Sequence, residues 1–115
     1  MIKTIDPQEW SEYLAGFSTR NRGRRARFEL FSGGGVAEED EEGVFERIAI
    51  ENETVTVTRI DRTEGNDRTM ASEINGVRGI AVQLDTDSSE NTLEFTNSNG
   101  DMTVLHFESL VDGDS

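Results

Sequence analysis

The sequence predicts an α+β domain in which an N-terminal amphipathic helix packs on an antiparallel sheet of about six strands. Three observations lead to this prediction. Helical spacing of apolar residues is confined to the N-terminal part of the chain, apolar and polar residues alternate through most of the rest, and turn-forming residues separate the alternating stretches. A chain of 115 residues suits one compact domain. We therefore interpret residues 1–115 as a single domain.

The best-defined element is a helix over about residues 7–18. Asp6 can cap it, and Glu9 stands three residues later, where its side chain can reach back to the cap. A proline occupies the first helical position, where no amide hydrogen is needed. Ile5 and Trp10 have the spacing of a hydrophobic staple. One apolar face then follows at helical spacing, formed by Trp10, Tyr13, Leu14 and Phe17.

Three strands and one loop are predicted in the next part of the chain. Residues 25–31 place apolar side chains at every second position, which is typical of a strand with one buried face. Residues 32–43 combine three consecutive glycines with five consecutive acidic side chains, so we expect an exposed, mobile acidic loop. Residues 44–50 and 54–60 alternate on either side of a short polar segment and are expected to form a hairpin.

The rest of the chain is interpreted as a connection followed by a three-stranded meander. Residues 61–76 are mostly polar and are expected to form a long connection, with at most one helical turn around 70–74. Alternation then returns in three stretches that are separated by segments rich in Asp, Asn, Ser and Gly. The tail at 110–115 is expected to be frayed. The apolar residues of the meander are Ile80, Val82, Leu84, Leu93, Phe95, Leu105 and Phe107.

Composition argues against several classes of function. The chain has 24 acidic and 11 basic side chains, a formal charge of −13, no cysteine and one histidine, His106. A protein without cysteine has no disulfide, no thiolate nucleophile and no cysteine-based zinc site, and one histidine cannot make a multi-histidine metal centre. We therefore predict that the protein is not an enzyme and has no catalytic residues, no metal site and no cofactor.

Charge and hydropathy also predict the compartment and the kinds of partner. No apolar stretch approaches the roughly 20 residues of a membrane span, and the N-terminus lacks the apolar core of a signal peptide. We therefore expect a cytoplasmic protein without membrane contact. Residues 37–115 carry 20 acidic and five basic side chains, a balance that repels nucleic acid, so we expect no DNA binding.

The type of charged residue indicates adaptation to salt. Ten of the eleven basic side chains are arginine, and the acidic ones are scattered over 38–115. At molar salt the Debye length is about 3 Å, so repulsion between surface carboxylates costs little. The alternative is that the acidic side chains form a binding surface that captures a basic protein or mimics nucleic acid. The scatter of acidic residues favours the adaptation to salt.

Two motifs carry a family resemblance. The helix opens with Asp6-Pro7-Gln8-Glu9-Trp10, an Asp-Pro-x-x-Trp pattern, and residues 23–30 include a Gly-Arg-x-Ala-x-x-Glu strand pattern. With the turn at 51–53 and the closing hairpin at Asn99-Gly100, the chain resembles a family of small bacterial proteins catalogued as a domain of unknown function. The resemblance spans most of residues 4–108. It implies a stand-alone bacterial domain and brings no activity or catalytic residue.

One concentrated feature has the opposite sign to the whole chain. A cluster of arginines follows the predicted helix and could dock an acidic partner or an RNA backbone. The alternative, which we favour, is that these arginines pair internally with acidic side chains such as Glu38–Glu42. The possible interaction patch consists of Arg20, Arg22, Arg24, Arg25 and Arg27.

Other candidate sites have simpler structural explanations. His106 alternates with two apolar neighbours, so we expect it on the opposite sheet face, facing solvent or packing rather than acting as a general base. The segments 85–90 and 97–101 offer oxygen ligands for calcium or magnesium but do not match the EF-hand spacing, and we interpret them as hairpin turns. The glycines at 33–35 lack the lysine of a phosphate-binding loop.

The sequence therefore predicts a non-enzymatic cytoplasmic module that binds another protein in a salt-adapted bacterium. One alternative is a domain that binds a small molecule or a divalent cation, through a cleft between helix and sheet or through the acidic turns. Another is a structural subunit, such as a homodimer formed through an edge strand. The sequence leaves open whether the protein is a monomer or a homodimer.

Overall fold

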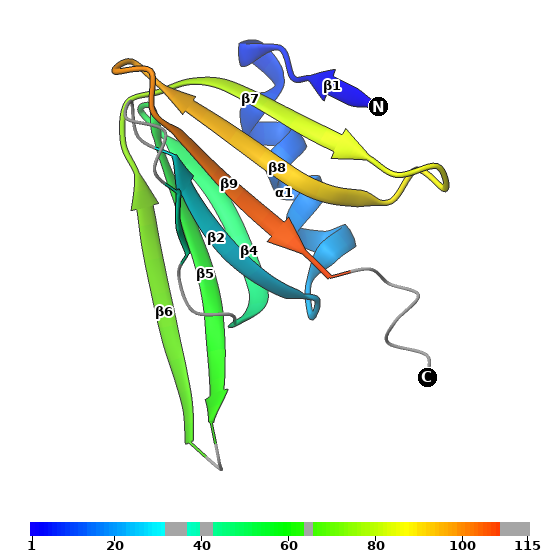
Figure 1. Ribbon diagram of the computed structural model, residues 1–115, viewed down its shortest axis with the longest axis vertical. Helices are drawn as coiled ribbons and strands as arrows, with labels where there is room; N and C mark the ends of the chain where they lie inside the picture. The colour runs from blue at the N-terminus through cyan, green and yellow to red at the C-terminus, as the bar shows by residue number, and fades with distance from the viewer. Residues whose placement is uncertain (32–36, 40–42, 64–65, 109–115) are drawn as a thin grey trace.

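The computed structural model describes residues 1–31, 37–39, 43–63 and 66–108. It confirms the α+β prediction, because one helix, α1, packs on a large antiparallel sheet (Figure 1). The sheet has nine strands in these residues, where the sequence predicted about six. The elements are β1 (Ile2–Thr4), a 3-10 turn (Pro7–Glu9), α1 (Trp10–Asn21), β2 (Arg25–Phe31), β3 (Ala37–Glu39), β4 (Gly43–Glu51), β5 (Thr54–Thr63), β6 (Asn66–Ile74), β7 (Val77–Leu84), β8 (Glu90–Asn97) and β9 (Met102–Phe107).

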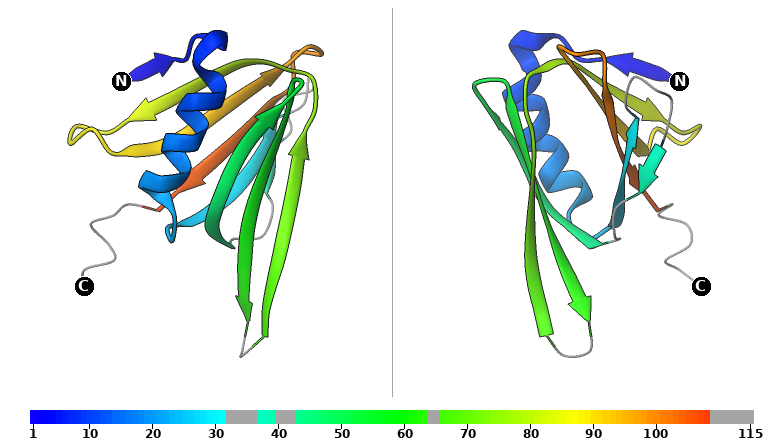
Figure 2. Two further views of the ribbon diagram at one scale, coloured as in Figure 1. Left: turned by 180° about the vertical axis from the view of Figure 1, so that it is seen from behind. Right: turned by 60° about the vertical axis from the view of Figure 1, so that its left-hand side comes forward.

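The sheet bends around the helix (Figure 2). Its strand order is β1-β7-β8-β9-β2-β4-β5-β6, and β3 pairs with β2. β2 pairs with β9 along most of its length but with β4 only at Arg25 and Ala26, so the sheet can turn sharply between β2 and β4. The predicted hairpin is confirmed as β4 and β5, and the predicted meander as β7, β8 and β9. We call the face against α1 the inner face and the opposite face the outer face.

The start of the helix follows its sequence signals with one change. The Asp6 carboxylate accepts a hydrogen bond from the Gln8 amide at 3.0 Å, but this cap opens a 3-10 turn, and the α-helix itself begins at Trp10. Glu9 contributes its backbone amide, which donates to the Asp6 carbonyl at 2.8 Å. Trp10 packs against the core cluster that contains Ile5, as the staple spacing predicted, and its indole also donates to the Ile5 carbonyl at 3.0 Å.

The core lies between α1 and the inner face. Leu14 and Phe17 are fully buried, as the apolar helix face predicted. The Phe17 ring meets the rings of Phe45 and Phe107 edge to face, with centroids 5.8 and 5.3 Å away. Ser18 also ties the helix to β4, because its hydroxyl oxygen accepts from the Ile48 amide at 2.9 Å. Helix and sheet are therefore joined by ring packing and by a buried polar contact.

Residues 61–76 correct the sequence-based prediction. This segment is not a long connection: it holds the end of β5 and all of β6, which pairs with β5 in a continuous antiparallel ladder. β6 lies at one end of the sheet, and Ile74 is the one buried residue among its described side chains. An edge strand with so little buried surface has no apolar alternation for sequence analysis to detect.

Two other predicted segments fall partly or wholly outside the described residues. Within the predicted acidic loop 32–43, residues 37–39 form the short strand β3 and residue 43 begins β4, while residues 32–36 and 40–42 lie outside the described residues. The predicted frayed tail at 110–115 also lies outside them. Across the described ranges, no helix has both the length and the apolar character needed to cross a membrane.

Candidate functional site

The structure separates the arginines of the predicted patch. Arg20 lies in the last turn of α1, and Arg22 and Arg24 lie between α1 and β2. Arg24 is buried, whereas the other two are exposed. Arg25 and Arg27 follow on β2, at positions that alternate with its buried inner-face residues. The five side chains therefore do not form one continuous exposed patch.

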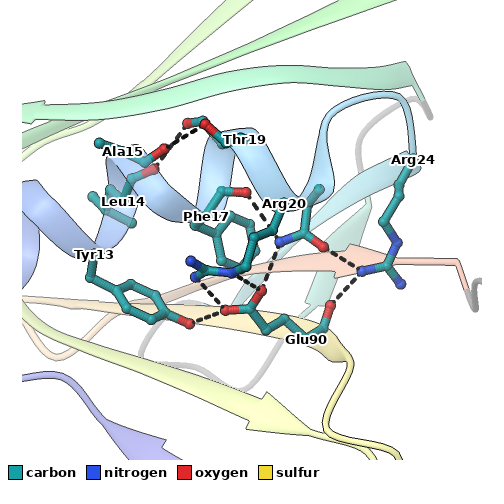
Figure 3. A network of polar contacts seen from close by, with 10 residues as sticks. Tyr13, Leu14, Ala15, Phe17, Thr19, Arg20, Arg24 and Glu90 are labelled. Carbon is teal, nitrogen blue, oxygen red and sulfur yellow. Dashed lines mark hydrogen bonds and ion pairs between the residues drawn. The ribbon is translucent and has the colours of Figure 1, made fainter.

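Arg20 and two other residues of α1 meet at Glu90, the first residue of β8 (Figure 3). Arg20 binds the Glu90 carboxylate through two hydrogen bonds, Nε to Oε1 at 2.9 Å and Nη2 to Oε2 at 2.8 Å. The Tyr13 hydroxyl donates to Oε2 at 2.5 Å, and Asn21 Nδ2 donates to Oε1 at 3.0 Å. One carboxylate thus accepts four hydrogen bonds from the helix and joins it to the sheet.

Burial and hydrogen bonding act in opposite directions on the pKa of Glu90. Burial is the largest single effect and raises this pKa, but the hydrogen bonds from Arg20, Tyr13 and Asn21 together bring it below its usual value. Burial and the hydrogen bond to Glu90 raise the pKa of the Tyr13 hydroxyl well above its usual value. At neutral pH the site therefore holds an ionised Glu90 and a neutral Tyr13, and neither group is poised for proton transfer.

Arg24 also binds Glu90, but through the backbone carbonyl of Glu90 and not through its carboxylate. Its Nη1 donates to the Glu90 carbonyl oxygen at 2.6 Å and to Asn21 Oδ1 at 2.8 Å, and its Nη2 donates to the Glu108 carbonyl oxygen at 2.5 Å. The guanidinium lies 5.1 Å from the centroid of the Phe107 ring. Burial lowers the pKa of Arg24. Arg24 thus holds together the end of α1, the start of β8 and the end of β9.

Of the five arginines, Arg20 and Arg22 pair with acidic side chains, as the internal-pairing interpretation expects, whereas Arg24 donates to backbone carbonyls and asparagine side chains. Arg22 lies 3.8 Å from the Glu46 carboxylate and donates to the Glu46 carbonyl at 3.1 Å, although both side chains are about half exposed and the pair contributes little stability. The partners are thus Glu90 and Glu46, together with backbone carbonyls. The side chains of Glu38–Glu42, the partners considered from the sequence, lie outside the described residues. Arg25 and Arg27 also have interaction partners.

The outer face carries a second candidate site over β2, β9 and β8. Register places Glu29 opposite Val104 and Val104 opposite Glu94, so two carboxylates flank an apolar side chain. In the next row Phe31 lies opposite Met102. Val104 is only 4% exposed and floors a hollow of about 300 Å³. We call it the outer hollow; its lining includes Glu29, Phe31, Glu94, Met102, Val104 and His106.

His106 lies in the outer hollow. As predicted, it is on the opposite face from its buried neighbours Leu105 and Phe107. Its Nε2 lies 2.7 Å from Glu29 Oε1, and its neighbours across the sheet are Arg27 on β2 and Thr92 on β8. The contact holds the Glu29 carboxylate in place beside the apolar floor. The arrangement therefore offers fixed negative charge next to an apolar surface, which suits a cationic group on an apolar stem.

The acidic turns use their oxygen atoms to hold the backbone. Asp87 accepts from the amide and the hydroxyl of Ser89, and Asp85 accepts from the Thr86 amide at 2.8 Å. Asn97 Oδ1 accepts from the amides of residues 99 and 101 at 3.0 and 2.9 Å. These are turn-stabilising contacts. In the part of the chain that the structure describes, no three His, Asp or Glu side chains are grouped to hold a metal ion.

No protein-family model, no curated protein and no solved structure matches the chain. The resemblance to a bacterial domain of unknown function, based on the Asp-Pro-x-x-Trp and Gly-Arg-x-Ala-x-x-Glu motifs, therefore stays a prediction.

Sequence reasoning missed both sites in part. Glu90 was counted only as one residue of an acidic turn, and nothing nearby in the sequence marks it as the partner of Tyr13 and Arg20, which lie 77 and 70 residues away. The outer hollow had a weak signal. Glu29 and Phe31 alternate on one predicted strand, and Val104 and His106 alternate on another, but only the strand pairing brings them together.

Proposed function

We propose that the protein is a non-enzymatic interaction module that binds a basic protein segment through the outer hollow, in the cytoplasm of a salt-adapted bacterium. The observation that carries the proposal is the row Glu29–Val104–Glu94, in which carboxylates flank an apolar floor. The inner face around α1 supplies the core, and among the described elements no helix covers the outer face (Figure 2). Phe31, Glu94 and Met102 are only partly buried on the outer face, which supports contact with a partner there.

The shape and chemistry of the outer hollow favour a protein segment as its occupant. Phe31 and Met102 are partly exposed beside the buried Val104, so an apolar side chain gains contact area there. Glu29 and Glu94 stand on either side and suit lysine or arginine side chains in the same segment. In high salt these charges act only at short range, so the contacts of Glu29 and Glu94 with basic side chains matter more for binding than the net charge of −13. We infer that the partner presents alternating basic and apolar side chains.

A charge reversal within the outer hollow tests this proposal. The probe is a fluorescein-labelled peptide of alternating lysine and leucine, and its affinity is measured by fluorescence anisotropy. We expect a dissociation constant on the order of 10 μM, weakened at least about 10-fold by Glu94→Arg, because the new cation repels the peptide. The matched control is Glu51→Arg, which makes the same change in net charge at an exposed position of β4.

Three results would contradict the proposal. They are equal binding of a peptide in which glutamate replaces lysine, equal weakening by both variants, and no binding by the unaltered chain. Robust turnover in a broad hydrolase or transferase screen would contradict the non-enzymatic part.

The salt-adapted origin makes a separate prediction about stability. Acidic side chains outnumber basic ones by 24 to 11, so repulsion among them is screened when salt is added. We expect the melting temperature to rise by several degrees, on the order of 5 °C, in about 2 M sodium chloride, as measured by circular dichroism. A neutral osmolyte at the same osmolality is the control. An equal rise in the osmolyte, or no rise in salt, would contradict the prediction.

Two alternatives have their own tests. A domain that binds divalent cations would release or absorb heat on titration with calcium or magnesium, but the carboxylates of the 85–90 turn already hold the backbone. A homodimer formed through an edge strand would use β6, which pairs only with β5 among the described strands. Sedimentation velocity separates monomer from dimer. Binding of a small molecule is favoured by a different hollow, which is lined by residues of β2, β6 and β9.

A further inference from the structure

A second hollow, of about 450 Å³, lies where β2 ends and β9 begins. The helix α1 contributes no residue to its lining. The lining comes from β2, β6, β9, the last residue of β8 and the segments that follow β6 and β8. The Ser98 amide donates to the Gly76 carbonyl at 3.1 Å, which fixes one of these segments against the other. Its volume falls within the range of roughly 300–1,000 Å³ that is common for small-ligand sites. We call it the inner hollow.

The inner hollow has an apolar part that the fold leaves exposed. Leu30 pairs with Thr103, which pairs with Phe95, so Leu30 lies on the inner face. Most apolar side chains of this face are buried, but Leu30 is 41% exposed. Only Met1 and Ile2 are comparably exposed among the described large hydrophobic residues, and both are at the N-terminus. Leu30, together with Phe28 and Ile74, gives the inner hollow an apolar surface.

The polar lining of the inner hollow is almost uncharged. Of its nine lining residues only Glu73 is ionisable, in a chain in which 30% of residues are charged. A hollow with one carboxylate has little to offset the cost of desolvating a charged ligand. The other polar lining residues carry amides or hydroxyls: Ser72, Asn75, Asn97, Asn99 and Thr103.

The side-chain amides of Asn75 and Asn97 have –NH2 groups that can donate hydrogen bonds to a ligand. Asn75 Oδ1 accepts from the Thr54 hydroxyl at 3.1 Å, and Asn97 Oδ1 accepts from two backbone amides. The oxygen of each amide is therefore already engaged, and within the described residues neither Nδ2 group donates to a protein acceptor. Each –NH2 group can donate to a ligand oxygen.

We propose that the inner hollow binds a small uncharged ligand that carries several hydroxyl groups and an apolar face, such as a hexose. Hydroxyl oxygens of the sugar accept from Asn75 and Asn97, and its hydroxyl hydrogens are donated to Thr103, Ser72 or Glu73. The C–H face of the ring packs against Leu30 and Ile74. This site is separate from the outer hollow and does not depend on the function proposed there.

The test is an NMR titration of the isotope-labelled full chain with glucose, galactose and maltose. Glucuronate serves as the charged probe. We expect saturable shifts of the Leu30 methyl signals and of the Asn75 and Asn97 side-chain amides, with a dissociation constant on the order of 1 mM for at least one neutral sugar. Glucuronate is expected to bind at least about 10-fold more weakly, because Glu73 and the net charge of −13 repel its carboxylate.

Asn75→Asp is one variant: its carboxylate keeps an oxygen for the Thr54 hydroxyl, loses the –NH2 donor and adds a negative charge. We expect at least about a 10-fold loss of affinity. Thr103→Val, which has nearly the same shape, is a second variant and is expected to lose about 3-fold. His106→Gln, on the outer face, is the control and is expected to leave sugar binding unchanged. Dispersed amide spectra confirm that each variant is folded.

The proposal fails if no neutral sugar gives saturable shifts at about 100 mM, a concentration far above the expected dissociation constant. It also fails if the shifts lie outside the inner hollow, if a charged probe binds as tightly as a neutral one, or if both folded variants keep full affinity. Peptide binding at the outer hollow is measured separately, so either proposal can fail without the other.

Discussion

Replacement of Phe17 by alanine is expected to lower the free energy of unfolding by about 3–5 kcal/mol, the usual cost of removing a large aromatic side chain from a core. Phe17 has no exposed surface, and its ring lies within 6.0 Å of the rings of Tyr13, Phe45 and Phe107. The truncation removes apolar burial and three ring contacts, and the sheet that wraps around α1 cannot collapse freely into the space. Urea denaturation at neutral pH measures the change.

Phe31→Ala is the matched control. The same side chain is removed from the outer face, where Phe31 is partly exposed, and we expect a loss of at most about 1 kcal/mol. Trp10→Ala should fall between the two, because Trp10 packs against the core but is only half-buried. Equal losses for Phe17→Ala and Phe31→Ala would show that α1 does not sit against the inner face as described.

Glu90→Gln is expected to destabilise the fold by about 2–3 kcal/mol at neutral pH, because charge-assisted hydrogen bonds contribute more than neutral ones. The Glu90 side chain is 11% exposed and accepts from Tyr13, Arg20 and Asn21. Arg20 is 50% exposed, so water can solvate it after the carboxylate is lost, which keeps the effect below that of a fully buried pair. Urea denaturation gives the loss.

The stability difference between the unaltered chain and Glu90→Gln also depends on pH. Hydrogen bonds hold the pKa of folded Glu90 below the unfolded value of about 4.3. The ionised carboxylate therefore stabilises the fold above that pH, and the stabilisation is lost as the pH falls through the lower folded pKa. The difference between the two proteins should be full at pH 7 and shrink on acidification below about pH 4.

Glu46→Gln controls for the loss of one negative charge. Glu46 pairs with Arg22 at 3.8 Å and both side chains are about half exposed, so we expect a change within about 0.5 kcal/mol. A loss for Glu90→Gln no larger than this, or one that persists undiminished at pH 3, would exclude the hydrogen-bonded carboxylate as the link between helix and sheet.

Local patterns were sufficient to predict most of the fold. Trp10, Leu14 and Phe17 repeat at helical spacing and bury one helix face, as expected. The strands with a buried inner face, such as β2 and β8, show alternation that is visible in the sequence. The strands that were missed are β1, β3 and β6. β1 and β3 have three residues each, and β6 is an edge strand with little burial, so none of them repeats an apolar residue often enough to be detected.

The candidate sites were less predictable than the fold. The arginine cluster was noticed as a charge feature, but its members divide between a buried network, a surface pair and the outer face. The outer and inner hollows each combine residues from at least three strands. Both depend on strand order, and the inner hollow depends also on the bend between β2 and β4, because its lining joins β6 to β2 and β9. Neither the order nor the bend is encoded in the spacing of residues within one segment.

The amino-acid sequence by itself determined the helix with its buried face, the alternating strands and the acidic balance, because these depend on neighbours within a few positions or on composition alone. Only the tertiary structure decided that Glu90 meets Tyr13 and Arg20, that Val104 lies between two carboxylates and that Leu30 stays exposed on the inner face. The physical reason is distance along the chain: contacts between residues about 70 positions apart are set by how the curved sheet closes around its helix.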